Sequence, residues 1–218
     1  MANKLTEPYW LAWLRWHAYR RFKPAPRYRT MWAFRQYVRR CPPGGVLVDC
    51  GANVGDVTRL FLEKGFTVYA FEPDPVAAAE LRRRLGGNPL LHLREAAVAA
   101  APGKQPLYRA SDASLGHTQS SSLFLRSALH DEVVETEVID LFAFIGSLDR
   151  PVNVLKLDIE GAEAEILERM LDERTYADID RIFVETHESI SPDIAASIQR
   201  SRRRIAEERI TNIDLEWA

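Results

Sequence analysis

The sequence predicts an α/β fold in which a mostly parallel sheet is covered by helices on both faces. From residue 46 onward, short β-branched runs alternate with segments of helical periodicity, the pattern of parallel strands joined by crossover helices. With 218 residues, 46% of them hydrophobic, the chain can form one globular domain with a sizeable core. A "CPPGG" stretch at 41–45 separates this region from an N-terminal segment of different composition.

The strands and helices follow in order from the local patterns. The expected strands are 46–50, 66–72, 90–94, 105–110, 133–140, 152–160, 179–187 and 210–217. The expected helices are 54–64, 75–85, 141–147, 161–171 and 193–208. The region 102–150 is the least regular, because "APGK" and "SDASLGHTQSSS" are rich in turn residues.

An aromatic and basic segment precedes the first strand. Residues 7–22 carry tryptophans and leucines at helical spacing, "KPAP" interrupts that helix, and a second helix is expected over 28–40. We therefore divide the chain into an N-terminal α-helical arm, 1–43, and a ligand-binding domain, 44–218.

The arm and the domain carry opposite charge. Residues 1–41 contain ten Lys or Arg and one acid, Glu7, a net charge of +9, whereas the remainder carries −11. A basic arm favours an anionic partner such as nucleic acid, a membrane surface or an acidic carrier protein. Two other interpretations stay open: the arm packs on its own acidic domain, or it covers the substrate pocket as a lid.

The cysteine content and the apolar runs indicate a compartment. Cys41 and Cys50 are too few for a disulfide framework and suit a reducing environment. The N-terminal apolar stretch is interrupted by Arg15 and His17 and has no small-residue cleavage site, and no later run reaches membrane-spanning length. We expect a cytoplasmic protein.

The stretch "VLVDCGANVGDVTRLF" at 46–61 places two glycines between a strand and a helix. Gly51 and Gly55 permit a tight turn and a close approach of backbone to a ligand, although a glycine pair after a strand is often only a turn. The G-x-G-x-x-G fingerprint of dinucleotide sites fails, because Asn53 and Asp56 occupy its second and third glycine positions. A phosphate-binding P-loop fails as well, since no G-K-[ST] follows.

A nucleoside ligand without phosphate remains, and a cationic one is favoured because Asp49 ends the strand beside the same turn. S-adenosylmethionine fits this description. Glu72 ends the second strand 21 residues after Gly51, where a carboxylate can accept both ribose hydroxyls. Glu95 follows the third strand and either accepts the adenine amino group or is a solvated surface residue.

Three matches, in order along the chain, resemble one family. "DCGANVG" at 49–55, "FEPDP" at 71–75 and "KLDIEGAEAEIL" at 156–167 are similar to the FkbM family of S-adenosylmethionine-dependent methyltransferases. The resemblance implies a seven-stranded class I methyltransferase (Rossmann-like) fold and methyl transfer to oxygen, commonly a hydroxyl on a sugar, polyketide or similar metabolite. In this chain only one helix and one strand follow "RIFVETH", so we expect the closing strand pair to be abbreviated.

The resemblance also implies which residues form the cofactor site. They are Asp49, Gly51, Asn53, Gly55 and Glu72, with Ser122 of the "SSSL" segment nearby.

The chemistry is expected at the ends of two later strands. Strand alternation puts Lys156, Asp158 and Glu160 on one face, and Glu185 and His187 end the next strand on one face. If the two strands are neighbours, Asp158, Glu160, Glu185 and His187 converge beside the cofactor. Asp158 is then expected to belong to both the catalytic site and the cofactor site.

His187 is then the expected general base, because its unperturbed pKa is near neutrality, with Asp158 or Glu185 orienting it. Lys156 is expected to stabilise a developing alkoxide. Three other interpretations stay open: a satisfied histidine at a strand end, a structural Lys156–Asp158 pair, and a Mg²⁺ or other divalent ion held by two carboxylates and the histidine. We expect no metal, since no tight ligand spacing demands one.

Competing functions differ in their acceptor. Methylation of base amines in nucleic acid favours [ND]-P-P-[YF] after the fourth strand, where this chain has "DIEG"; RNA ribose or cap methylation stays open through the basic arm. A non-catalytic binding module and an enzyme docked to a lipid-linked glycan are further alternatives. The prediction favoured here is O-methylation of a small-molecule hydroxylated acceptor.

Overall fold

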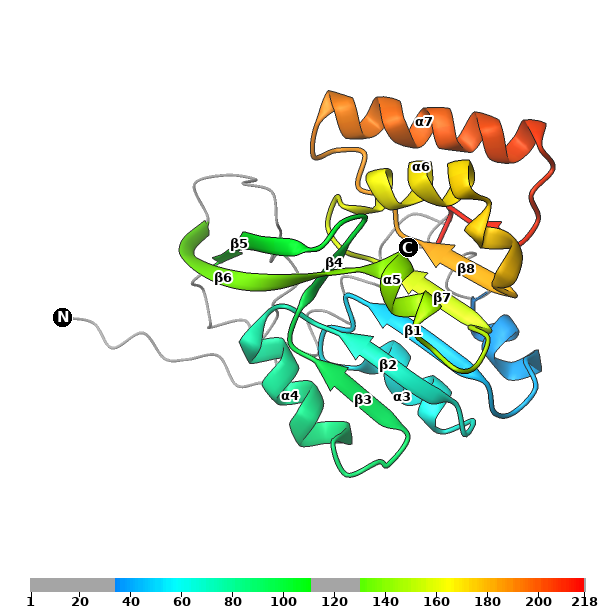
Figure 1. Ribbon diagram of the computed structural model, residues 1–218. Coiled ribbons are helices and arrows are strands. Elements are labelled where there is room, and N and C mark those ends of the chain that lie inside the picture. The colour runs from blue at the N-terminus through cyan, green and yellow to red at the C-terminus, as the bar shows by residue number, and fades with distance from the viewer. Residues whose placement is uncertain (1–33, 111–129, 218) are drawn as a thin grey trace, which may run out of the picture.

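The computed structural model describes residues 34–110 and 130–217 (Figure 1). Among them, six parallel strands form the main sheet in the order β3-β2-β1-β7-β8-β9. Their bounds are β1 Val46–Cys50, β2 Thr67–Phe71, β3 Leu91–Arg94, β7 Val154–Leu157, β8 Arg181–Val184 and β9 Ile213–Asp214. This confirms the predicted α/β fold with a mostly parallel sheet. The expected helix at 7–22 lies outside the described residues.

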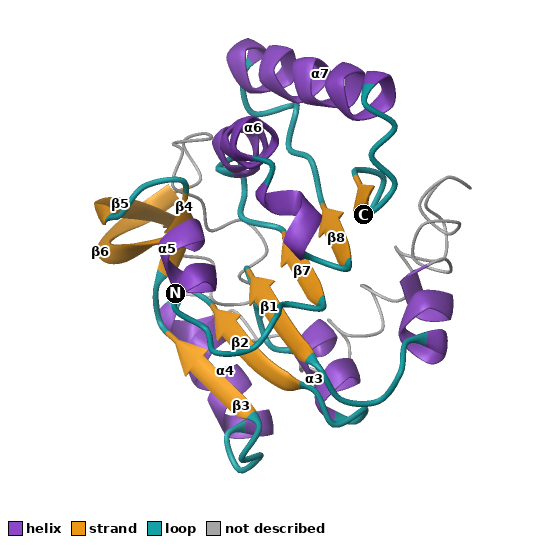
Figure 2. Ribbon diagram, turned by 45° about the vertical axis from the view of Figure 1, so that its right-hand side comes forward, coloured by secondary structure: helices purple, strands orange, loops and turns teal. Residues whose placement is uncertain are grey.

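Helices cover both faces of the main sheet, as predicted (Figure 2). Helices α5, α6 and α7 lie on one face, and α3, α4 and a helix over residues 34–40 lie on the other. The bounds are α3 Asp56–Leu62, α4 Pro75–Leu85, α5 Leu141–Gly146, α6 Glu163–Glu173 and α7 Pro192–Glu207, with a short 3-10 helix, η2 Thr175–Asp178, after α6.

The strand alternation explains how one strand serves two cores. In β1, Val46 and Val48 belong to the core under α5, α6 and α7, whereas Leu47 belongs to the core under α3 and α4. A strand buried on both faces is therefore almost continuously apolar. Asp49 breaks this pattern, because its carboxylate is fully buried in β1.

The described end of the predicted arm packs into the domain. Phe34 and Val38 are buried in the core under α3 and α4, and the Phe34 ring lies 5.0 Å from Phe183 and 5.6 Å from Trp217, centroid to centroid. The backbone carbonyls at the end of this helix accept hydrogen bonds from the Lys64 amine. The division at 43 stays a prediction.

A second sheet lies beyond the carboxyl ends of β1, β2 and β3 (Figures 1 and 2). Its three strands have the order β4-β6-β5, with bounds β4 Ala97–Ala99, β5 Gly103–Ala110 and β6 His130–Asp140. Strands β5 and β6, both expected from the sequence, pair antiparallel, whereas β4 pairs parallel with β6 and was not predicted.

The main sheet closes in the abbreviated form that was expected. The resemblance implied seven strands, and the described residues form six, all parallel. The strand expected over 210–217 is reduced to Ile213–Asp214, because a bend at Leu215 ends its pairing with β8. No helix in the described part of the chain has both the length and the apolar character that a membrane crossing requires.

The strand order reverses between β1 and β7. The second and third strands of the chain extend the sheet on one side of β1, and β7, β8 and β9 extend it on the other. In open α/β sheets, ligands bind outside the carboxyl ends of the strands at this reversal. A ligand is therefore expected at the loops that follow β1, β2, β7 and β8.

Candidate active site

The loop after β1 and the end of β7 are in direct backbone contact. Gly51 has a φ of +76°, and a Cβ atom there would lie 1.8 Å from the carbonyl oxygen of Asp158. Gly55, with a φ of +87°, precedes α3, and its Cβ would lie 2.8 Å from the Leu85 side chain. Both glycines are thus required by the packing of the turn, and the turn itself joins the predicted cofactor loop to the predicted catalytic strand.

Glu72 is held at the end of β2 by the same loop. Its Oε2 accepts a hydrogen bond from the Asn53 backbone N–H at 2.7 Å, and its Oε1 accepts one from the Asp74 backbone N–H at 2.9 Å. The side chain is only 6% exposed. Burial raises the pKa of Glu72 to about 7, although the two backbone hydrogen bonds act in the opposite direction.

Asp49 is paired within the protein. Its Oδ2 accepts a hydrogen bond from Thr58 Oγ1 of α3 at 2.7 Å, and its Oδ1 lies 3.3 Å from the Lys156 amine of β7. The register explains this contact, because Asp49 and Lys156 are partners across β1 and β7. Asp49 is fully buried on the α3 side of the sheet, so it stabilises the cofactor loop and Lys156 through these contacts. Its partner Thr58 was not identified from the sequence.

Lys156 bridges the loop and the catalytic strand. Its amine donates to the carbonyl of Gly51 and lies 3.4 Å from Asp158 Oδ2, and the side chain is 3% exposed. Burial lowers the pKa of Lys156, but Asp158 and Asp49 outweigh burial and raise it above its ordinary value. The amine therefore carries a positive charge at neutral pH and is paired with Asp158; its expected action on an alkoxide stays a prediction.

Three predicted residues converge beyond β7 and β8. The two strands are neighbours, and Asp158, Glu160 and His187 each offer a ligand atom within 4.8 Å of the others. His187 Nε2 lies 3.5 Å from Glu160 Oε2 and 3.9 Å from Asp158 Oδ1. Glu160 reaches this position through a left-handed backbone conformation, φ +59°, which turns the chain after β7.

A fourth residue, Glu163, holds the histidine. It is the first residue of α6 and fully buried, and its Oε1 lies 2.9 Å from His187 Nδ1. The same carboxylate accepts hydrogen bonds from the backbone N–H groups of Ile159 and Gly161. Because a carboxylate only accepts, Nδ1 donates, and Nε2 faces Asp158 and Glu160.

The protonation of His187 differs from the expectation. Burial lowers the pKa of His187, but the hydrogen bond to Glu163 and the charges of Glu163, Glu160 and Asp158 outweigh burial and raise the pKa to about 9. At neutral pH the imidazole is therefore protonated in the ligand-free protein. His187 can act as a general base only after Nε2 has lost its proton.

Three more predicted residues are either not members of this group or outside the described residues. Glu185 directly follows β8 and is half-buried, and it is not a member of the group formed by Asp158, Glu160 and His187. Glu95 is exposed and forms an ion pair with Arg82 of α4, which matches the interpretation as a surface residue. Ser122 lies outside the described residues.

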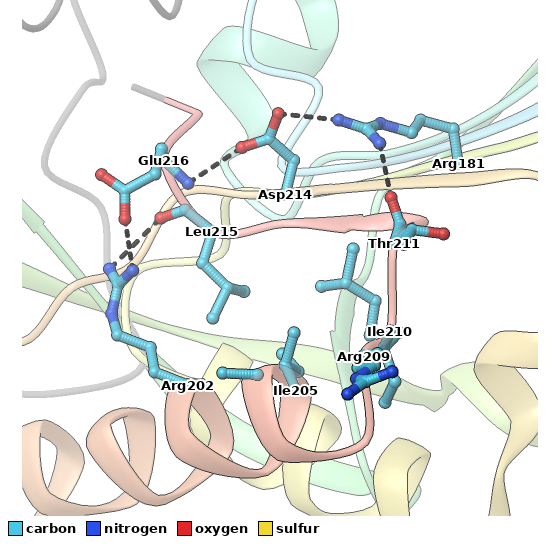
Figure 3. Close-up of a pocket in the computed structure, with 11 residues that line it drawn as sticks. Arg181, Arg202, Ile205, Arg209, Ile210, Thr211, Asp214, Leu215 and Glu216 are labelled. Carbon is cyan, nitrogen blue, oxygen red and sulfur yellow. Dashed lines mark hydrogen bonds and ion pairs between the residues drawn. The ribbon is translucent and has the colours of Figure 1, made fainter.

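A separate pocket of about 410 Å³ lies between α7 and β9 (Figure 3). Two of its three arginines form ion pairs with carboxylates that also line the pocket: Arg181 with Asp214 at 3.0 Å, and Arg202 with Glu216. Because the pocket lies beside the edge strand β9, away from the strand reversal, we do not assign the chemistry to it.

Comparison with known proteins gives a consistent result. Residues 49–209 match the family model described as the methyltransferase FkbM domain. The chain is 28% identical over 193 residues to 31-O-demethyl-FK506 methyltransferase FkbM of Streptomyces tacrolimicus, a match that covers 74% of each chain. It is 27% identical over 168 residues to Methyltransferase 1 of Beauveria bassiana (strain ARSEF 2860), covering 68% of this chain and 67% of that one.

Proposed function

Since the chain belongs to the FkbM family of methyltransferases, we propose that it transfers a methyl group from S-adenosylmethionine to a hydroxyl group of a small molecule. S-adenosylmethionine is the usual methyl donor of such enzymes. One observation carries the proposal: the backbone of Gly51, in the loop after β1, touches that of Asp158, so the predicted cofactor loop and the acidic group at β7 are contiguous.

The residues present fit the cofactor. Both oxygens of Glu72 are fixed by backbone N–H groups, and each retains a lone pair for a ribose hydroxyl. The formal charge is suitable as well. Lys156 and the protonated His187 offset two of the four carboxylates around them, those of Asp49, Asp158, Glu160 and Glu163, so the group stays negative. A cationic sulfonium is favoured at such an edge, and a pyrophosphate is not.

Bound S-adenosylmethionine supplies an electrophilic methyl group, so the protein need only orient the acceptor and remove its proton. Asp158, Glu160 and His187 face one another at the carboxyl ends of β7 and β8. We assign to these three side chains the binding of the acceptor hydroxyl and the uptake of its proton. Glu163 keeps the imidazole in place, and Lys156 fixes Asp158 against the cofactor loop.

Two observations favour oxygen as the acceptor atom. The name of the Streptomyces relative describes a substrate that lacks an O-methyl group, which favours oxygen as the acceptor atom. A hydroxyl also suits an acidic site, because carboxylates accept its hydrogen bond. We propose a sugar, a polyketide or a similar metabolite.

The role of the basic segment 1–41 and the cellular location of the protein are also proposed. We propose that this segment contacts an anionic partner, a membrane surface or the acceptor itself. An anionic partner is favoured if binding is lost between low and moderate salt and is also lost when the residues before Phe34 are deleted. Cys41 and Cys50 are buried free thiols, which is consistent with a cytoplasmic location.

The test is a binding measurement followed by an assay. S-adenosylhomocysteine at about 100 times its dissociation constant should stabilise the protein by roughly 2.7 kcal/mol in thermal unfolding, NAD should not, and Glu72→Ala should weaken the effect. Radiolabelled methyl transfer to a panel of hydroxylated acceptors then identifies the substrate class. A folded protein that is not stabilised by the adenosyl ligand would contradict the proposal.

A further inference from the structure

The group formed by Asp158, Glu160 and His187 has the composition of a metal site. Each side chain offers one ligand atom, two carboxylate oxygens and one imidazole nitrogen, and these atoms lie within 4.8 Å of one another. The three residues are half-buried, so an ion could enter from solvent and still be partly shielded.

The distances suit a shared ligand better than direct hydrogen bonds. His187 Nε2 is 3.5 Å from Glu160 and 3.9 Å from Asp158, beyond the roughly 2.7–3.2 Å of a hydrogen bond. Ligand atoms about 2.1 Å from one cation are about 3.0–3.4 Å apart at octahedral or tetrahedral angles. To close the site around an ion, the three ligand atoms must approach one another from at most 4.8 Å to about 3.0–3.4 Å.

The neighbouring groups direct the ligand atoms inward. His187 donates from Nδ1 to the fully buried Glu163, which leaves Nε2 toward the two carboxylates. A histidine that is backed by a carboxylate on its second nitrogen is the usual arrangement at protein metal sites. Asp158 uses different oxygens for different partners, because Oδ2 faces Lys156 and Oδ1 faces His187.

We propose that Asp158, Glu160 and His187 bind one divalent cation, with Glu163 as the positioning residue. The mixed oxygen and nitrogen set favours Mn²⁺ or Zn²⁺ over Mg²⁺, which prefers oxygen ligands. Three protein ligands leave coordination positions open, and an acceptor hydroxyl bound there becomes more acidic. The role of the ion rests on the proposed function; the site itself rests on the geometry alone.

Electron paramagnetic resonance tests this directly. The full-length protein, treated with chelator and without adenosyl ligand, is titrated with Mn²⁺, and the loss of the free-ion signal gives the affinity. We expect one ion per chain, with affinity reduced more than about tenfold in Glu160→Gln and His187→Ala, and about tenfold in Glu163→Gln. Glu188→Gln, one residue from His187 but paired with Arg202, should bind as the wild type does.

A second measurement needs no variant. Bound Mn²⁺ should show electron spin echo modulation from an imidazole nitrogen. Failure of stoichiometric binding, or bound Mn²⁺ without the nitrogen signal, overturns the assignment. Stabilisation by S-adenosylhomocysteine, measured in parallel, separates the two proposals: a protein that binds the adenosyl ligand but no Mn²⁺ loses the metal site and keeps the proposed function.

Discussion

His187 Nδ1 lies 2.9 Å from Oε1 of Glu163, a carboxylate without exposed surface at the first residue of α6. The backbone N–H groups of Ile159 and Gly161 bind the same carboxylate, at 2.8 and 2.7 Å. Glu163 thus ties together the turn after β7, the start of α6 and the histidine after β8. Any chemistry at His187 depends on this one buried carboxylate.

Replacing Glu163 by Gln should therefore change both orientation and stability. Gln has one acceptor oxygen in place of two, so one of the three groups that donate to Glu163 (Ile159 N–H, Gly161 N–H and His187 Nδ1) would face an amide NH₂. We expect the free energy of unfolding in urea to fall by about 1–3 kcal/mol. Turnover should fall by roughly 10–100-fold, and the imidazole ¹⁵N shifts of His187 should move. Glu165→Gln is the matched control, because Glu165 is exposed in the same helical turn. Unchanged ¹⁵N shifts in Glu163→Gln would contradict a positioning role.

The convergence at β7 and β8 could be predicted from the sequence, whereas its support could not. Asp158, Glu160 and His187 follow from the period of two and from the pairing of consecutive strands. The last acid of "DIEGAE", Glu163, stood in the quoted motif without a role, because an acid at a helix start is ordinarily explained by the helix dipole. Its contact with His187, 24 positions away, forms only in the tertiary structure and is not indicated by the local sequence.

The charge states depend on tertiary structure for the same reason. The expectation for His187 used its unperturbed pKa, but three carboxylates from separate positions raise it to about 9. Asp49 was expected to face the ligand, yet its side chain is buried against Thr58 and Lys156. Strand β4 has only three residues, too short a run for periodicity to indicate.

The contact between Gly51 and Asp158 predicts a large effect of one methyl group. Gly51→Ala places a Cβ at 1.8 Å from a backbone carbonyl oxygen, so the loop or the end of β7 must move. Gly65 has the same φ, +76°, but a Cβ there would have no atom within 4 Å, and Gly65→Ala should cost only the left-handed strain of about 1–2 kcal/mol. In urea unfolding, Gly51→Ala should cost clearly more and should also abolish binding of S-adenosylhomocysteine. Equal losses of stability in the two variants would rule out the steric explanation.

Glu72 predicts that adenosyl-ligand binding strengthens with pH. Ribose hydroxyls donate to the ionised carboxylate, and with a pKa of about 7 in the free protein the ionised fraction rises between pH 6 and pH 8. The affinity for S-adenosylhomocysteine should therefore increase about tenfold over this range, measured by calorimetry. Asp74 and Lys156 are the charged side chains that act on this carboxyl group. Glu72→Gln should bind weakly with a flat profile, whereas Glu95→Gln should behave as wild type; a weakened Glu95→Gln would instead support its predicted contact with adenine.

The same carboxyl group should act on stability with the opposite sign. The folded-state pKa of Glu72, about 7, lies above its ordinary value of 4.5, so the folded protein holds a proton that the unfolded chain has released. The contribution of Glu72 to the free energy of unfolding is fully present below pH 4.5 and is lost as the pH rises to about 7. In urea unfolding without ligand, the free energy of unfolding should therefore decline more steeply with rising pH in the wild type than in Glu72→Gln. A decline of equal slope in both would assign the pH dependence to other groups.

Lys156 should be worth far more to the fold than any surface cation. Lys156→Met removes the charge between Asp49, which is fully buried, and Asp158, and leaves the Gly51 carbonyl without its donor. Removing one partner of a buried pair costs about 3–5 kcal/mol, because the remaining charge is uncompensated. Arg59→Met breaks the exposed pair with Glu63 within α3 and should cost no more than about 0.5 kcal/mol. A double variant, Asp49→Asn with Lys156→Met, should recover part of the loss in urea unfolding, since no buried carboxylate then remains at Asp49. A double variant as unstable as the sum of the two single variants would mean that Lys156 acts through Asp158 and the Gly51 loop alone.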